Sequence, residues 1–224
     1  MWVVGGGGCD GAVVAAMREK VLNLREHGFE RAFIILTGAG GEDGVVQAAL
    51  ELQGIAYTGS GVAASAIKMD KVAVKRLWLA EKLPTADFCV LENEADANAA
   101  AKALGYPFVI KPSSEGSSVG VTIVKTPAQV APAFKLARGS GRAVMAERFI
   151  KGAEMTVAVL SGEALPSIRI EPDGEFYDYH AKYISNATKY QCPTGLPKAQ
   201  DKAPREPAVQ TFALVGTQGW GRGG

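Results

Sequence analysis

The sequence has no excess of either charge and no cysteine pattern that would organise a metal site or a set of disulfides. Its 24 lysines and arginines oppose 23 acidic residues, a formal net charge of +1, so no overall field favours nucleic acid. Cys9, Cys89 and Cys192 lie far apart and form no C-x-x-C pair, which argues against a disulfide framework and a structural zinc site. Any binding of phosphate must therefore be local.

Long apolar runs are also missing. The N-terminus has no basic region and reaches Asp10 before any adequate apolar run, so we expect no signal peptide. No stretch is long and apolar enough to span a bilayer. The hydrophobic content of 47% is ample for a packed core, and the scattered cysteines suit a reducing compartment. Together these features predict a globular, cytoplasmic protein that binds no membrane.

The Walker spacing G-x-x-x-x-G-K-[ST] is absent, but another glycine-rich loop is present. Two apolar runs, 108–110 and 121–124, flank a segment of Pro, Ser, Gly and Glu, which predicts a strand, a loop and a strand. Gly116 and Gly120 would let backbone N–H groups turn inward, and Lys111 ends the first run as a compact positive charge. Such a loop can fold over an anion. A mobile surface turn is the alternative interpretation.

The remaining pattern predicts an α/β protein. A helix over 12–27, a strand over 32–36, a glycine-rich turn over 37–44 and a helix over 45–52 indicate a parallel sheet. Further along we expect strands over 88–91 and 144–150, helices over 92–104 and 126–139, and antiparallel strands over 155–160, 165–170 and 175–182.

Residues 65–82 have the spacing of one amphipathic helix. Its lysines 68, 75 and 82 favour a solvated basic face, so we expect Lys68, Lys75 and Lys82 to be exposed.

The loop sequence Lys-Pro-Ser-Ser-Glu-Gly-Ser-Ser-Val-Gly at 111–120 resembles that of the D-alanine-D-alanine ligases, a branch of the ATP-grasp superfamily. The likeness extends through most of 33–196 and includes Met-Asp-Lys at 69–71 and Phe-Tyr-Asp-Tyr-His-Ala-Lys-Tyr at 176–183. The family usually has His-Gly where this chain has Thr37 and Gly38. The resemblance implies an α/β ATP-grasp fold: a partial, doubly wound N-terminal domain over 1–59, then two α+β lobes over 60–146 and 147–224.

The resemblance also implies roles for individual side chains. Three lysines would neutralise the phosphates of ATP: Lys71, Lys111 and Lys182. Loop residues would close over the nucleotide: Glu115, Ser117 and Ser118. The nucleoside would lie against Glu147, Arg148 and Glu154, with Glu154 on the ribose. Two further groups complete the catalytic set: Tyr183, which would pair with Ser117 to hold the loop shut, and Arg222, which would stabilise the transferring phosphate.

The implied reaction joins two D-alanines through a D-alanyl phosphate, for peptidoglycan precursor synthesis, with ATP and Mg²⁺ and in a homodimer. Tyr183 favours an amine over a hydroxyl acid as second substrate. Arg222 is followed by two glycines, so the family's three metal ligands have no counterpart, and the family's N-terminal Ser-x-Glu is also missing. We therefore expect a ligase sequence that is truncated or altered at both ends. The alternatives are a nucleotide-binding remnant or pseudoenzyme, and another ATP-grasp ligase of a carboxylate and an amine.

Overall fold

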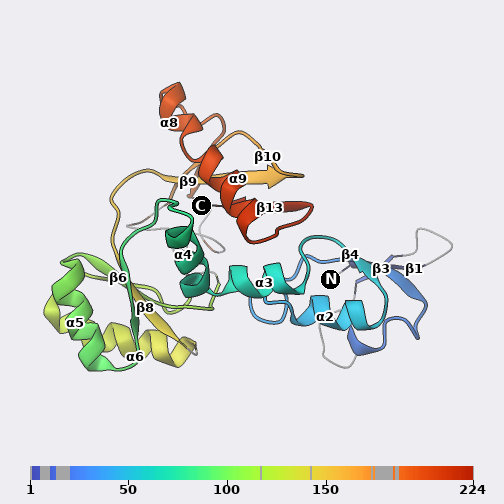
Figure 1. The fold of residues 1–224 in the computed structure, drawn as a ribbon, viewed down its shortest axis with the longest axis horizontal. Coiled ribbons are helices and arrows are strands. Elements are labelled where there is room, and N and C mark those ends of the chain that lie inside the picture. The colour runs from blue at the N-terminus through green and yellow to red at the C-terminus, as the bar shows by residue number, and fades with distance from the viewer. Residues whose placement is uncertain are drawn as a thin grey trace.

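The structure is a computed structural model that describes residues 2–5, 11–13, 21–116, 118–141, 143–172, 174, 184 and 187–223. Its strands form three sheets, one in each of three lobes that follow one another along the chain. In Figure 1 the N-terminal lobe lies at the right, the middle lobe at the lower left and the C-terminal lobe at the top. In the described residues, no helix has the length and apolar character needed to cross a membrane.

The N-terminal sheet has the strand order β2-β1-β3-β4. Its elements are β1 (Trp2–Gly5), β2 (Gly11–Val13), β3 (Phe29–Phe33), α2 (Val45–Leu52) and β4 (Ala56–Tyr57). The β3 and β4 strands are parallel, as the alternation of strand and helix predicts, whereas β1 is antiparallel to both β2 and β3.

Two sequence predictions are wrong in this sheet. The helix expected from residue 12 begins instead as a strand, because residues 11–13 pair with β1, and apolar spacing alone does not separate a short strand from a helix. The strand expected over 32–36 lies three residues earlier. Its pairing ends at Phe33, and the backbone N–H of Ile34 donates instead to Thr58 Oγ1 at 3.0 Å.

The single helix expected over 65–82 is two helices, α3 (Val62–Met69) and α4 (Lys71–Ala80). Asp70 between them has the extended backbone angles φ −92° and ψ 101°. Its carboxylate accepts hydrogen bonds from the N–H groups of Val72 and Ala73, at 2.9 and 3.3 Å. Aspartate is a preferred N-cap because it satisfies the free N–H groups of a first turn. A new helix therefore starts at Lys71, where the chain passes from α3 to the middle lobe (Figure 1).

The middle sheet is antiparallel, in the order β5-β8-β6-β7. Its strands are β5 (Phe88–Leu91), β6 (Phe108–Pro112), β7 (Thr122–Val124) and β8 (Val144–Arg148), and its helices are α5 (Glu94–Leu104), η1 (Pro127–Gln129) and α6 (Val130–Ser140). These elements confirm the strand, loop and strand predicted around the glycine-rich segment.

Alternation along the strands gives this sheet two different faces. Phe108 and Ile110 of β6 and Val144 and Ala146 of β8 are fully buried in the core formed with α5 and α6. The residues that alternate with them along the strands, including Lys111 and Glu147, point to the opposite face, where α4 lies. One face therefore builds the core, and the other is available for a site.

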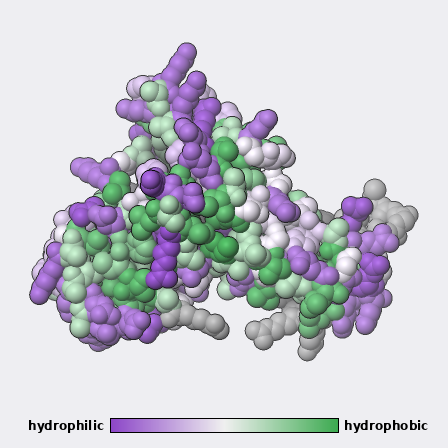
Figure 2. All heavy atoms as spheres, in the orientation of Figure 1, coloured by the Kyte–Doolittle hydropathy of each residue, from purple (hydrophilic) through white to green (hydrophobic). Residues whose placement is uncertain are grey.

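The C-terminal sheet has the order β10-β9-β11-β12. The β13 strand also pairs with β9, on the edge opposite β10. Its elements are β9 (Glu154–Leu160), β10 (Glu163–Ala164), β11 (Ile168–Glu171), β12 (Lys189–Gln191), α8 (Lys198–Lys202), α9 (Arg205–Leu214) and β13 (Trp220–Gly223). The antiparallel pairing of β9 with β11 is as predicted. The strand predicted over 175–182 lies outside the described residues. Figure 2 shows hydrophilic residues on the outer ends of the three lobes and hydrophobic ones gathered nearer the centre.

Candidate nucleotide-binding site

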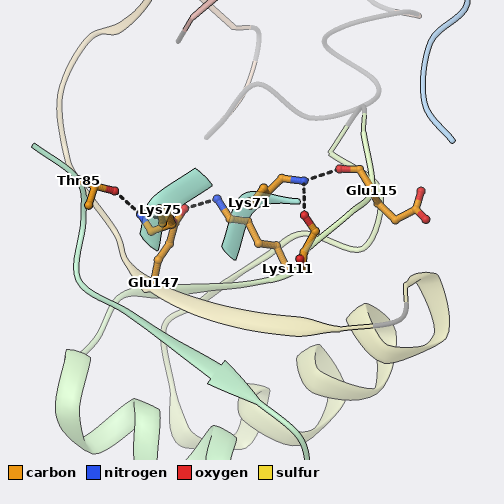
Figure 3. A network of polar contacts seen from close by, with 7 residues as sticks. Lys71, Lys75, Thr85, Lys111, Glu115 and Glu147 are labelled. Carbon is orange, nitrogen blue, oxygen red and sulfur yellow. Dashed lines mark hydrogen bonds and ion pairs between the residues drawn. The ribbon is translucent and has the colours of Figure 1, made fainter. Parts of the chain in front are cut away.

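The free face of the middle sheet carries a carboxylate held between two ammonium groups. Glu147 of β8 contacts Lys75 of α4 through Oε2, at 3.1 Å from Nζ, and contacts Lys111 of β6 through Oε1. The side chains of these three residues are 17%, 6% and 18% exposed. Glu147 and Lys111 meet because β6 and β8 are neighbours in the sheet and Val109, two residues from Lys111, pairs with Glu147. Figure 3 shows the Glu147 side chain between those of Lys75 and Lys111.

The pair of cations controls the ionisation of Glu147. Burial opposes ionisation of this carboxyl, but Lys111 and Lys75, by charge and by hydrogen bond, hold the pKa of Glu147 below its usual value. The carboxylate is therefore charged near neutral pH.

The burial of Lys75 contradicts the solvated role expected from the sequence. The residue is 5% exposed, its Nζ donates to Thr85 Oγ1 at 2.6 Å, and the same atom lies 5.2 Å from the centre of the Phe88 ring. Lys68, whose Nζ lies 2.8 Å from Ser60 Oγ, and Lys82 are both exposed, as expected. Helical spacing assigns residues to faces, but only the sheet packed on α4 decides which face is solvated.

Lys71 lies one helical turn before Lys75 and points toward the glycine-rich loop (Figure 3). Its Nζ donates to the carbonyl oxygens of Ser113, at 3.3 Å, and Glu115, at 2.5 Å. Burial, with repulsion from Lys111, lowers the pKa of Lys71 to about 8. The structure thus brings two cations that were predicted to bind phosphate to the start of one loop.

Asp70 fixes the same loop against the start of α4. The hydroxyl of Ser113, which is 1% exposed, donates to the Asp70 carboxylate. The backbone N–H of Ser113 donates to Ala143 O at 2.8 Å, and its carbonyl accepts from the N–H of Lys71 at 3.0 Å. Burial opposes ionisation of Asp70, yet hydrogen bonds from Ser113 and from two backbone N–H groups lower its pKa. The loop therefore starts from an anchored residue.

The far end of the loop requires glycine at position 120. Gly120 has φ +69°, and a Cβ there would lie 2.9 Å from Pro112 Cγ and from the Ser140 side chain. At the loop's centre Gly116 approaches the N-terminal lobe, since a Cβ built on it would lie 3.8 Å from the Cα of Gly38. The glycine-rich turn over 37–44 and the loop over 111–120 are thus neighbours in space.

Four other predicted site residues lie outside the contacts described above: Arg148, Glu154, Arg222 and Ser118. The side chain of Arg148 is on the core side of the sheet, opposite Glu147, where it pairs with Asp87 at 3.2 Å and donates to Leu104 O at 3.0 Å. Glu154 begins β9 and is exposed, and Arg222 in β13 pairs with Ala158 of β9. Ser118, with φ 61°, continues the loop.

Three more of the predicted site residues are outside the described part of the chain: Ser117, Lys182 and Tyr183. In the described part, no three His, Cys, Asp or Glu residues lie close enough to hold a metal ion. The Mg²⁺ expected from the family stays a prediction.

Sequence reasoning missed two features of this cluster, the place of Lys75 in it and the contact of Ser113 with Asp70. Lys75 could have been found, because residues four apart share a helix face and Lys71 was already assigned to phosphate. The Ser113 contact with Asp70 links positions 43 apart in sequence, and no local pattern signals it.

Comparison with known proteins decides the family. A family model described as "D-ala D-ala ligase C-terminus" matches residues 77–223. The chain is 48% identical over 217 residues to the D-alanine–D-alanine ligase of Laribacter hongkongensis, an alignment that covers 97% of this chain and 70% of that protein. The chain belongs to the D-alanine–D-alanine ligase family. This confirms the resemblance carried by the loop and the Met-Asp-Lys segment.

Solved structures of D-alanine ligases give the same answer for the fold. The Bacillus anthracis D-alanine–D-alanine ligase matches with TM-score 0.80 and 31% identity, over 94% of this chain and 69% of that one. Its complex with ATP matches with TM-score 0.76, at 26% identity and over 94% and 67% of the two chains. The VanG D-Ala:D-Ser ligase of Enterococcus faecalis matches with TM-score 0.76 and 31% identity, over 86% and 58%. The α/β ATP-grasp fold expected from the sequence is therefore confirmed.

Proposed function

We propose that this chain binds ATP on the free face of the middle sheet and uses it to join two D-alanines for peptidoglycan precursor synthesis. The observation that carries the proposal is the convergence of Lys71 and Lys111 on the start of the glycine-rich loop, in a member of this ligase family. The carbonyl groups that now accept from Lys71 are uncharged, so a triphosphate would be a stronger partner for its ammonium group.

The electrostatics of the cluster favour an anionic ligand. Lys111 contacts the carboxylate of Glu147, and Lys71 lies close enough to be affected by the charge of Lys111 as well as by the carboxylates of Glu115, Glu147 and Asp70. The lowered pKa of Lys71 follows from burial and from the nearby Lys111 charge. A phosphate would relieve this repulsion. Cations that are already in position stabilise developing charge without the cost of reorganising solvent.

In the proposed reaction, a carboxylate oxygen of the first D-alanine attacks the γ-phosphorus of ATP, and the bond from that phosphorus to the bridging oxygen breaks to release ADP. The amine of the second D-alanine then attacks the carbonyl carbon of the acyl phosphate, which expels phosphate and loses a proton. The products are the dipeptide, ADP and phosphate.

Each predicted site residue has a place in this proposal. Lys71, Lys111 and Lys182 neutralise phosphate charge, and Glu115, Ser117 and Ser118 belong to the loop that closes over it. Glu147 and Glu154 hold the nucleoside, with the backbone of Arg148 beside the base, because the Arg148 side chain points to the other face. Tyr183 pairs with Ser117, and Arg222 stabilises the transition state.

The test is phosphate release by the purified 224-residue chain with ATP, Mg²⁺ and D-alanine, beside a reaction without D-alanine. D-alanine-dependent release supports the proposal, and Lys111→Ala should remove it. Binding of a non-hydrolysable ATP analogue by a folded chain without release would indicate a nucleotide-binding remnant. A folded chain that binds no nucleotide would refute the proposal.

A second candidate is a ligase with a different second substrate. The similarity to the VanG D-Ala:D-Ser ligase favours including D-serine. Mass spectrometry of products from equal D-alanine and D-serine would decide between them, since the two dipeptides differ by one oxygen atom.

The remaining expectations are part of the same proposal. They are a homodimer, a cytoplasmic location, Mg²⁺ as the metal of ATP, no nucleic-acid partner, and domains over 1–59, 60–146 and 147–224. Sedimentation of the purified chain would test the dimer.

A further inference from the structure

Lys75 has no role in the nucleotide site proposed above, yet it is the most buried of the three lysines in the cluster. Its ammonium group contacts Glu147 Oε2 at 3.1 Å and Thr85 Oγ1 at 2.6 Å, and it lies 5.2 Å from the centre of the Phe88 ring. The side chain is 6% exposed. Burying an ammonium group is costly unless it is paired, so the Glu147 carboxylate is the charge that compensates for the burial of Lys75.

The two lysines that contact Glu147 differ in what they can reach. Lys111 is 18% exposed and lies in the strand that leads directly into the glycine-rich loop. The ammonium group of Lys75 lies on the side of Glu147 away from the loop, beside Thr85 and the Phe88 ring (Figure 3). A phosphate at the loop could therefore recruit Lys111, whereas Lys75 would stay on Glu147.

The charge balance makes this difference important. Suppose that Lys111 were the one cationic partner of Glu147. Moving Lys111 to a phosphate would then leave the Glu147 side chain, which is 17% exposed, charged and unpaired. Removing one member of a buried charge pair is costly for that reason. With Lys75 on Oε2, the carboxylate stays paired after Lys111 leaves Oε1.

We propose that Lys75 is a positioning residue of the nucleotide site, which neutralises Glu147 and so frees the ammonium group of Lys111 for the triphosphate. The inference rests on the proposed nucleotide-binding function and assigns Lys75 no contact with the ligand. Under this proposal, loss of Lys75 should weaken the binding of ligands that carry phosphates and change the binding of the nucleoside much less. The reason is that the Lys111 charge is needed for the triphosphate and much less for the nucleoside.

The test compares two probes on the whole chain, a non-hydrolysable ATP analogue and adenosine, by isothermal titration calorimetry. Lys75→Met keeps the length of the side chain and removes the charge. We expect the ratio of the adenosine Kd to the analogue Kd to fall by about tenfold or more in this variant. Lys75→Arg, which keeps the charge, should retain most of the wild-type ratio.

The matched control is Lys135→Met, because Lys135 is 73% exposed and pairs with Glu94 at 3.5 Å on the surface. It should leave the ratio unchanged. A purely structural role for Lys75 would weaken both probes together. In the double variant Lys75→Met with Glu147→Gln, the competing carboxylate charge is gone, so the ratio should return toward the wild-type value.

The outcomes separate the two proposals. A wild-type chain that is folded and binds neither probe would overturn the nucleotide-binding function, and this inference with it. A wild-type chain that binds both, with an unchanged ratio in Lys75→Met, would overturn the role of Lys75 alone. If Lys75→Met does not fold, Glu147→Gln decides: freeing Lys111 should increase the preference for the analogue, and an unchanged or lower preference would contradict the inference.

Discussion

Raising the pH from 7 to 9 should weaken the binding of an ATP analogue about tenfold, because Lys71 would lose its proton over that range. Burial and the nearby Lys111 charge lower the pKa of Lys71 to about 8. In the free protein its protonated fraction then falls from about nine tenths at pH 7 to about one tenth at pH 9. A bound triphosphate favours the ammonium form, so binding above pH 8 must take up a proton.

The lowered pKa of Lys71 has the opposite effect on the stability of the ligand-free chain, which should increase as the pH rises. A lysine whose pKa is lower in the folded chain than the usual 10.5 binds fewer protons there than in the unfolded chain, between about pH 8 and 10.5. The free energy of unfolding of the ligand-free chain should therefore rise with pH in that window. We expect a gain of about 1 kcal/mol from this residue between pH 7 and 9.

The assay is calorimetric titration of the analogue at several pH values, in buffers of different ionisation enthalpy, which reports the protons taken up. Adenosine is the control ligand, since it has no phosphate and its affinity should change little. Lys71→Arg is the control variant, because arginine stays protonated throughout, so its affinity profile should be flat. Tight binding at pH 9 by the wild-type chain, with no proton uptake, would refute the reasoning.

Three further predictions concern the loop and the core. Asp70→Ala should lower the free energy of unfolding by about 1–2 kcal/mol in urea denaturation, because α4 loses its cap and Ser113 its acceptor; Asp70→Asn should retain most of that stability, and equal losses in the two variants would contradict the capping role. Phe108→Ala, at a fully buried position, should cost about 3–5 kcal/mol, against less than about 1 kcal/mol for Leu136→Ala, which is 54% exposed; similar losses would show that the core is misassigned. Lys111→Ala should abolish binding of the ATP analogue in a folded chain, and an unchanged Kd would remove the central assignment.

The glycine-rich hairpin was predictable because its signals are local. Runs of apolar, β-branched residues predict β6 and β7, and the run of Ser, Gly and Pro between them predicts a loop. The end of α5 at Gly105 was predictable for the same reason, since Gly105 has φ +74°. Each of these features depends on residues within a few positions of one another.

The helix over 65–82 shows where local reasoning stops. Its apolar spacing continues through Asp70, and the spacing does not reveal that this carboxylate caps a second helix and binds Ser113. Lys68, Lys75 and Lys82 share a basic pattern, but Lys75 is buried against Glu147 whereas Lys68 and Lys82 are exposed, because the position of the middle sheet, and not the spacing of the lysines, decides which of them is covered. The side-chain direction of Arg148 is likewise set by strand pairing and not by its neighbours in sequence.

The sequence by itself determined the family, the ATP-grasp fold and the lysines expected to bind phosphate, since each depends on a motif of consecutive residues. Only the tertiary structure decided that α4 lies against the free face of the middle sheet and places Lys75 on Glu147 (Figure 3). The reason is physical: the protonation and availability of a charged group depend on burial and on the charges that surround it. In this chain that charge is Glu147, which lies 36 positions from Lys111 and 72 positions from Lys75 along the sequence and meets them from different elements.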